Sequence, residues 1–464
     1  MTTILKLYNE RQKENMIMDK KTAMKNLARE AHEKGAFNGA WLYAEGGKIV
    51  SRGAYGFRDA EDRLPMRENS LFHVASISKQ FTAAAILLLR RRGLLSLDDE
   101  ITRFFPELPY PGVTIRHLLT HTNGLPDFTA WAKETIRREG AMPDNEIILR
   151  FLRESGAAPE FAPGDRYSYG NTDYCLLAEL IKQLSGVSFE EFLQTEIFEP
   201  AGMSATRVGR PTTEEGAYGN LACGLVLDNG NYVLPENAAF DYMVPLSDQL
   251  RGCDNVYSNV DDLLAWDRAL RQENVLTKEE QREMATPVTL NDGTIASDDG
   301  NGYGFGWIIA DDPVLGSIVG HDGNWDGYMG WYERFLDADR LLIFLTSRVP
   351  ADVRAFVGFW DGMKAAARDK EPEAVRSLEE LAIPNPDCSD WKRFCGTYAS
   401  DNCRIEVFQK GNELFAAFRY KNGFAFTAKM MLLGEKTFGI KDDLGEMIFA
   451  DDSLSFWDKP YRKL

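Results

Sequence analysis

A serine and a lysine three residues apart stand at the start of one apolar segment of the chain. The segment reads Phe72-His-Val-Ala-Ser76-Ile-Ser-Lys79-Gln-Phe-Thr-Ala-Ala-Ala-Ile-Leu-Leu-Leu. A serine hydroxyl is a weak nucleophile at neutral pH and needs a base within hydrogen-bond reach. Positions i and i+3 of a helix share a face, so the Lys79 amine can reach the Ser76 hydroxyl, whereas the adjacent Ser78 faces elsewhere. Ser76 is therefore the predicted nucleophile, with Lys79 as its partner.

The place of this pair at a predicted helix N-terminus has two expected consequences. The partial positive charge of the helix end disfavours an ammonium group, which predicts a neutral and basic Lys79. The free backbone N–H groups could bind a developing oxyanion. Taken alone, Ser76 could also be a helix cap and Lys79 a solvated first-turn residue. However, the helix is apolar nearly all round, which predicts burial, and a lysine at the start of a buried helix needs a reason.

Two further polar elements follow along the chain, Tyr169-Gly-Asn171 and His321-Asp-Gly323-Asn324. The ordered set of Ser-x-x-Lys, Tyr-x-Asn and His-x-Gly marks β-lactamases and penicillin-binding proteins. The sequence strongly resembles the serine β-lactamase-like hydrolases of the class C type, from about residue 39 to about residue 347. That group includes class C β-lactamases, D-aminopeptidases, D,D-carboxypeptidases and family VIII-type esterases.

The resemblance implies catalytic roles for the second element. Tyr169 would be the phenol that exchanges protons with Ser76 and with the leaving group. Asn171 would hold the Lys79 amine and the carbonyl region of the substrate. The residue between them is Gly170, where many relatives have serine or alanine, and this position usually points away from the site.

The resemblance also implies roles for the third element. His321 stands where many relatives have lysine, and Gly323 would let the substrate backbone approach the strand that flanks the site. The backbone N–H groups of Ser76 and Asn324 would form the oxyanion hole. Asp326 could reach an amino group on a substrate, but we interpret it as a solvated loop carboxylate.

The order of predicted elements indicates an α+β fold of the class C β-lactamase type. It comprises an antiparallel sheet flanked by helices and a separate helical subdomain that extends to about residue 272, with the site between them. His117 and His121, on a short helix that ends at Asn123-Gly124, are interpreted as structural. The expected elements outside that subdomain are a helical lead over residues 1 to about 36, strands within 39–57 and near 307–309, 317–320, 330–335 and 341–346, and a last helix near 352–368.

The C-terminal part of the chain has a different sequence pattern. Residues 371–388 are charged and contain three prolines, which indicates a linker after a catalytic domain of residues 1–370. Short alternating runs separated by turns then predict a small antiparallel barrel or sandwich over residues 389–464. This segment resembles the lipocalin-like C-terminal domains of some D-aminopeptidases and related hydrolases.

Composition narrows the range of partners. The 464-residue chain carries 53 basic and 71 acidic residues, a net charge of −18, which argues against nucleic acid or an anionic membrane. The sequence from Met1 lacks the apolar stretch of a signal peptide, and no stretch approaches the ~20 apolar residues of a spanning helix, so a cytoplasmic location is expected. The six cysteines form no Cys-x-x-Cys pair, which predicts free thiols, no metal and no cofactor.

We therefore expect a serine hydrolase that cleaves an ester or amide bond, including that of a D-amino-acid-containing peptide, through an acyl-enzyme on Ser76. The substrate would be a small molecule or a short peptide. His321 offers no fixed positive charge to a substrate carboxylate, so a β-lactamase or D,D-peptidase is less expected. An acyltransferase that uses the same acyl-enzyme, or a non-catalytic sensor or scaffold, would also fit the sequence, and the oligomeric state is left open.

Overall fold

The computed structural model describes residues 20–140, 145–210, 220–228, 230–238, 250–298, 300–400, 402–421, 425–441, 445–456 and 459–464. The chain divides into two compact units. The first contains residues 1–21 and 38–349, and the second contains residues 22–37 and 350–464. These units do not correspond to the predicted domains, so the boundaries at residues 370 and 389 stay a prediction. The predicted lead over residues 1–19 lies outside the described residues.

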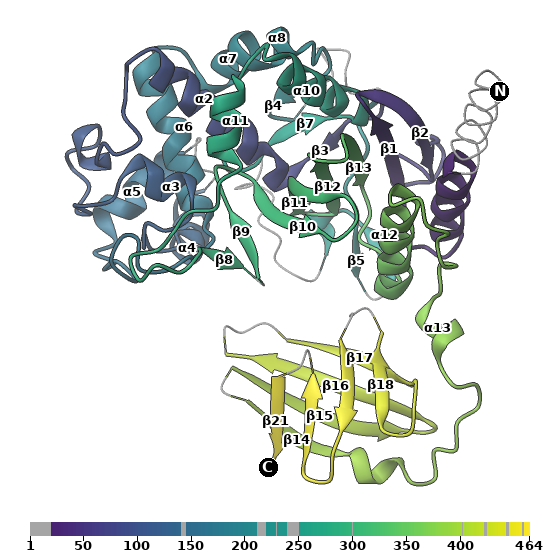
Figure 1. The fold of residues 1–464 in the computed structure, drawn as a ribbon. Helices are drawn as coiled ribbons and strands as arrows, with labels where there is room; N and C mark the ends of the chain where they lie inside the picture. The colour runs from purple at the N-terminus through teal and green to yellow at the C-terminus, as the bar shows by residue number, and fades with distance from the viewer. Residues whose placement is uncertain are drawn as a thin grey trace, which may run out of the picture. The chain divides into compact units, whose positions relative to one another are not determined.

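An eight-stranded antiparallel sheet is the framework of the first unit, in the order β2-β1-β13-β12-β11-β10-β9-β8 (Figure 1). The N-terminal hairpin turns at Gly46 and Gly47, which both have positive φ as such a two-residue turn requires. All strands predicted for this sheet are present. The short strands β8 and β9 were not predicted. The bounds of the eight strands are β1 Gly39–Glu45, β2 Lys48–Tyr55, β8 Ser297–Asp298, β9 Asn301–Tyr303, β10 Ile308–Asp312, β11 Gly316–Trp325, β12 Tyr328–Phe335 and β13 Arg340–Thr346.

Helices form the other part of the first unit. The predicted central helix is α2, and every residue from Lys79 to Leu89 is buried, as its all-round apolar pattern predicts. It packs against α6, which begins at Asn171 and ends in a left-handed cap at Gly186. The helical elements are η1 Ala75–Ser78, α2 Lys79–Arg91, η2 Ile101–Arg103, α3 Ile115–Leu119, α4 Thr129–Glu139, α5 Glu146–Glu154, α6 Asn171–Ser185, α7 Phe189–Leu193, η3 Gln194–Phe198, α8 Glu199–Ala201, η6 Pro235–Asn237, α10 Val260–Gln272 and α11 Lys278–Met284.

The prediction of continuous helical structure up to about residue 272 is wrong in part. A three-stranded sheet of β3 (Phe72–His73), β7 (Val256–Ser258) and β4 (Arg207–Val208) lies within this region. The hairpin of β5 (Val226–Asp228) and β6 (Asn231–Val233) is there too. Strands of two or three residues are too short to show a period of two in the sequence.

The second unit contains a helical pair and a barrel. The helix that ends at residue 33 buries the predicted apolar face of Met24, Leu27, Ala28 and Ala31. Leu27 lies against α12 (Val353–Ala367) at Gly362, where an added Cβ would be 2.8 Å from a Leu27 methyl group. The predicted linker contains a short helix, α13 (Leu378–Leu381).

The C-terminal strands form a closed antiparallel barrel, which decides between the barrel and the sandwich expected from the sequence. Burial alternates along β15, where Ile405 and Val407 are buried while Arg404 and Glu406 are exposed. Closure leaves no unpaired strand edge. The strands are β14 Gly396–Ala399, β15 Cys403–Lys410, β16 Glu413–Tyr420, β17 Ala425–Leu432, β18 Thr437–Ile440, β19 Glu446–Phe449, β20 Ser453–Phe456 and β21 Lys459–Lys463.

A buried ion pair connects α10 to the main sheet. The Asp267 carboxylate of α10 is fully buried and accepts a hydrogen bond of 2.7 Å from Nε of Arg334, on β12. Arg271 also donates to this carboxylate. A buried charge that loses a partner is strongly destabilising, whereas exposed ion pairs contribute little.

Replacing Arg334 with methionine should therefore lower the free energy of unfolding by roughly 3 kcal/mol, the lower end of the expected range because Arg271 remains. Urea unfolding of the variant measures this loss. The control is Arg52→Met, which removes an exposed pair with Asp261 on the same helix and should cost at most about 1 kcal/mol. Equal losses in the two variants would contradict the assignment.

Candidate active site

Ser76 lies in a strained turn that precedes the central helix. The sequence predicts Ser76 on the helix itself, but the structure places it in the 3₁₀ turn η1, and α2 begins only at Lys79. Ala75 has a φ of 48°, unusual for a residue with a side chain, and its N–H donates to Nδ1 of His73 (3.1 Å). The other members of η1 are buried, whereas Ser76 is half-buried and lines a cavity of about 500 Å³.

Two glycines on neighbouring strands let this turn lie against the sheet. Gly323 of β11 pairs with Gly330 of β12. A Cβ at Gly323 would lie 2.4 Å from the carbonyl oxygen of Val74, and a Cβ at Gly330 would lie 3.2 Å from a methyl group of Ile77. Gly323 is not among the residues that line the cavity. Gly323 therefore makes room for the turn that carries Ser76, and its expected role toward the substrate backbone stays a prediction.

The Lys79 amine is buried and makes three hydrogen bonds. It donates to Oγ of Ser76 (3.1 Å), to Oδ1 of Asn171 (2.9 Å) and to the backbone oxygen of Cys253 (2.9 Å). Three acceptors match the three N–H groups of an ammonium ion. The amide of Asn171 thus holds Lys79, as the resemblance implies.

The charge of Lys79 differs from the sequence expectation. Burial by itself lowers the pKa of Lys79, but the neighbouring Tyr169, Cys253 and Asp254 outweigh burial, so the pKa stands above its usual value. The partial positive charge of the helix end, taken alone, would favour a neutral amine. Because Lys79 begins α2 but its amine contacts groups on other segments, these contacts set its charge, and Lys79 is an ammonium ion in the resting site.

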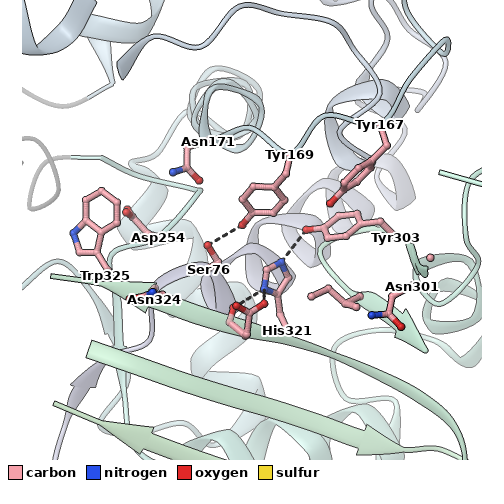
Figure 2. Close-up of a pocket in the computed structure, with 14 residues that line it drawn as sticks. Ser76, Tyr167, Tyr169, Asn171, Asp254, Asn301, Tyr303, His321, Asn324 and Trp325 are labelled. Atoms are coloured by element: carbon pink, nitrogen blue, oxygen red, sulfur yellow. Dashed lines mark hydrogen bonds and ion pairs between the residues drawn. The ribbon is translucent and has the colours of Figure 1, made fainter. Parts of the chain in front are cut away.

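Tyr169 completes the contacts of the Ser76 hydroxyl. Its phenol donates to Oγ of Ser76 at 2.8 Å (Figure 2). Its ring lies 4.8 Å from Nζ of Lys79. Tyr169 is 40% exposed, but partial desolvation of its phenol raises the pKa in spite of the nearby Lys79 charge, so the phenol keeps its proton at neutral pH. Both neighbours of Ser76 are therefore protonated at rest, and a base forms only when one of them loses its proton.

His321 is held as a neutral ring. Its Nδ1 donates to the backbone oxygen of Asp322, which fixes the tautomer, so Nε2 accepts a hydrogen bond from the Tyr303 hydroxyl (3.0 Å). Burial lowers the pKa of His321 to about 4. His321 lines the cavity, yet both of its nitrogens are occupied, so it neither supplies a positive charge nor acts as a base.

A second histidine, His121, packs against the ring of Tyr169. The His121 ring lies 4.4 Å from the Tyr169 ring, and its backbone oxygen accepts the N–H of Ser168 (2.8 Å). Its Nδ1 is 2.6 Å from Oδ2 of Asp173. Burial raises the pKa of Asp173 and lowers that of His121, and both shifts favour the neutral forms. The structural interpretation of His121 agrees with this packing, and His117 likewise caps α3.

The cavity also contains residues that the sequence analysis missed. Tyr303, which bonds to His321, belongs to a Tyr-Gly-Phe-Gly-Trp segment that resembles the family in sequence but was given no role in the site, whereas Asp254 has no such signal. Figure 2 shows Asp254 and Trp325 at one end of the cavity, with Tyr303 at the other. Asp326 lies apart, on a separate cavity of about 40 Å³.

The remaining predicted residue, Asn324, follows Gly323 on β11 and lines the cavity together with Ser76. Among the described residues, no cluster of three or more histidine, cysteine, aspartate or glutamate side chains could hold a metal ion. No helix in the described parts of the chain is long and apolar enough to cross a membrane.

Replacing Gly323 with alanine should displace the turn that carries Ser76, because the new methyl group would overlap the Val74 carbonyl. We expect the rate of covalent labelling of Ser76 by a fluorophosphonate probe to fall at least about tenfold, since small misplacements of reacting groups reduce rates strongly. Gly170→Ala is the matched control, because its Cβ would meet only the Asp173 carboxyl at 3.5 Å, an ordinary contact distance. Unchanged labelling of Gly323→Ala would show that the turn does not depend on this contact.

Comparisons with known proteins agree with this geometry. The Beta-lactamase family profile matches residues 24–365. Penicillin-binding protein 4* of Bacillus subtilis (strain 168) is 37% identical over 335 residues, which are 72% of this chain and 73% of that protein. A D-aminopeptidase of Gluconobacter oxydans (strain 621H) is 29% identical over 271 residues, which are 58% of this chain and 48% of that enzyme. The match thus spans about half of the D-aminopeptidase.

The fold has relatives among solved structures. The octameric penicillin-binding protein homologue from Pyrococcus abyssi has a TM-score of 0.64 at 24% identity, over 95% of this chain and 99% of that chain. The likeness therefore extends into both units, and it confirms the expected fold class, a β-lactamase-like fold with a C-terminal barrel. The chain belongs to the Beta-lactamase family of serine hydrolases.

Proposed function

We propose that this chain cleaves an amide or ester bond of a small molecule or short peptide, including D-amino-acid derivatives, through an acyl-enzyme on Ser76. One observation carries the proposal: Oγ of Ser76 opens into the cavity and is hydrogen-bonded to both Lys79 and Tyr169. The D-aminopeptidases among the relatives support the substrate class.

The reaction follows from these contacts. Once the Lys79–Tyr169 pair has lost one proton, it accepts the proton of Ser76 while Oγ attacks the carbonyl carbon. The backbone N–H groups of Ser76 and Asn324 stabilise the oxyanion. Tyr169 then gives a proton to the leaving group, and water releases the acid by the reverse transfer.

The neutral state of His321 favours substrates without a carboxylate at this position. A lysine there would supply a fixed positive charge, but the His321 ring has a pKa of about 4 and both nitrogens are already bonded. Penicillins and peptides ending in D-alanine carry such a carboxylate. We therefore place esters, simple amides and D-amino-acid derivatives before β-lactams.

A cytoplasmic setting is part of the proposal. All six cysteines are free thiols. The sulfur atoms of Cys175 and Cys253 are 3.3 Å apart in the core, next to the backbone oxygen that holds Lys79. Free thiols so close together are typical of a reducing compartment.

Ser76→Ala should abolish hydrolysis of p-nitrophenyl acetate and prevent formation of a covalent adduct detected by mass spectrometry, because it removes the hydroxyl that is hydrogen-bonded to both Lys79 and Tyr169. Ser78→Ala is the matched control. Its hydroxyl is buried and accepts the Val256 N–H (3.2 Å), so its loss should cost about 1 kcal/mol of stability but preserve the adduct. Loss of activity in Ser78→Ala, with activity retained in Ser76→Ala, would refute the nucleophile assignment.

Activity toward a neutral ester should rise with pH on the alkaline side of neutrality. The pKa values of Lys79 and Tyr169 are both raised, so the base forms as pH increases. Tyr169→Phe should reduce kcat by about 10²–10⁴-fold and shift or flatten this ascending limb. His321→Ala should keep the limb, because the ring is already neutral above about pH 4. A limb near pH 4 that disappears only in His321→Ala would make the histidine the base.

A further inference from the structure

Asp254 is a buried carboxylate without a strong hydrogen-bond donor in the wall of the active-site cavity. Its side chain lines the same cavity as Ser76, although the residue is only 2% exposed. Among the described residues no N–H or O–H group donates a hydrogen bond to either carboxylate oxygen, and the neighbouring Cys253 thiol is only a weak donor. An unpaired buried carboxylate is costly, and native structures rarely keep one without a use. The proposed reaction assigns no step to Asp254.

The charged neighbours of Asp254 do not neutralise it. Burial raises its pKa to about 7, the positive charges of Lys79 and Arg251 lower it, the Cys253 side chain also lowers it, and Asp326 raises it. The three N–H groups of Lys79 are directed at other acceptors, so Lys79 is no direct partner. These opposing influences leave the pKa of Asp254 near neutrality, so an additional cation beside the carboxyl group would ionise it fully.

Trp325 provides a second surface suited to a cation. It lines the same cavity as Ser76 and Asp254. Figure 2 draws Trp325 and Asp254 at the same end of the cavity. The face of an indole ring attracts ammonium groups, and the attraction is strongest where water is excluded.

The position of this end relative to Ser76 indicates which part of the substrate reaches it. The leaving group departs toward its proton donor, Tyr169. In Figure 2, Tyr169 and Asp254 lie on different sides of Ser76. The end that contains Asp254 therefore receives the acyl part of the substrate, next to Asn171.

We propose that Asp254 and Trp325 form a cation subsite that binds a protonated amino group on the acyl part of the substrate. The inference rests on the proposed acyl-enzyme function and narrows it to aminoacyl esters and amides and to peptides with a free amino terminus. Asp254 would then be the specificity-determining residue that contacts the substrate amino group, a role considered for Asp326 from the sequence.

The test compares alanyl p-nitroanilide, as separate D and L forms, with isobutyryl p-nitroanilide, in which a methyl group replaces the ammonium group. The readout is the ratio of their kcat/KM values. A charged hydrogen bond contributes about 1.5–3 kcal/mol, so Asp254→Asn should reduce the wild-type ratio by about 10–100-fold. The intrinsic reactivities of the two substrates cancel when the ratio is compared between variants.

Asp322→Asn is the matched control. Asp322 lines the same cavity beside His321, and its side chain is 46% exposed. The variant removes the same charge as Asp254→Asn but should keep the ratio. A ratio that falls only in Asp322→Asn, or that is equal in wild type and Asp254→Asn, would overturn the subsite. If wild type forms an adduct with isobutyryl p-nitrophenyl ester, the proposed function survives that result; no adduct and no turnover would overturn both.

A wild-type measurement keeps the inference testable even if Asp254→Asn fails to fold. The ratio should rise as pH increases through about 7, because Asp254 ionises there while the substrate ammonium keeps its proton up to about pH 8. The ratio compares kcat/KM values, which report ionisation of the free enzyme, so the ionisation of Lys79 and Tyr169 is common to both substrates and cancels. A ratio that is constant from pH 5.5 to 8 would overturn the assignment.

Discussion

The ammonium group of Lys79 is the interaction on which the rest of the site depends. Its three hydrogen bonds join the turn of Ser76, the start of α6 at Asn171 and the backbone at Cys253. These segments are far apart in the sequence, and each presents an acceptor only because the surrounding core fixes it. A buried cation tolerates no missing acceptor, so one side chain imposes the relative positions of three segments.

The sheet imposes the second constraint. The turn η1 packs on β11 and β12 where both strands have glycine, so the backbone of Ala75, with its positive φ, fits against a flat surface. Strain of this kind persists only where the surroundings determine it, and here it directs one hydroxyl into the cavity while the rest of the turn is buried. Strand β11 also contains Asn324, so the turn of the nucleophile packs on the strand that carries the proposed oxyanion donor.

The sequence allowed prediction of the parts of the site that follow from local spacing or from ordered motifs. Ser76 and Lys79 are linked by an i, i+3 relation, and Tyr169 and His321 belong to matched elements. The charge of Lys79 was not predicted correctly, and the packing of Gly323 against the turn of Ser76 was not predicted, because both depend on contacts between distant segments. Asp254 could not be recognised from the sequence, because no motif indicates that a carboxylate is buried without a strong hydrogen-bond donor. The barrel was predicted from its alternating runs, whereas its closure depends on pairing of the two end strands, β14 and β21.

The charges of Asp254 and Lys79 act on each other, and this coupling connects recognition with catalysis. Asp254 raises the pKa of Lys79, and Lys79 lowers the pKa of Asp254. A substrate ammonium group bound at Asp254 would offset the negative charge that holds the proton on Lys79. This lowers the pKa of Lys79, so the pair with Tyr169 would lose its proton more readily. Binding of a cationic acyl group would therefore help to form the base that the reaction requires.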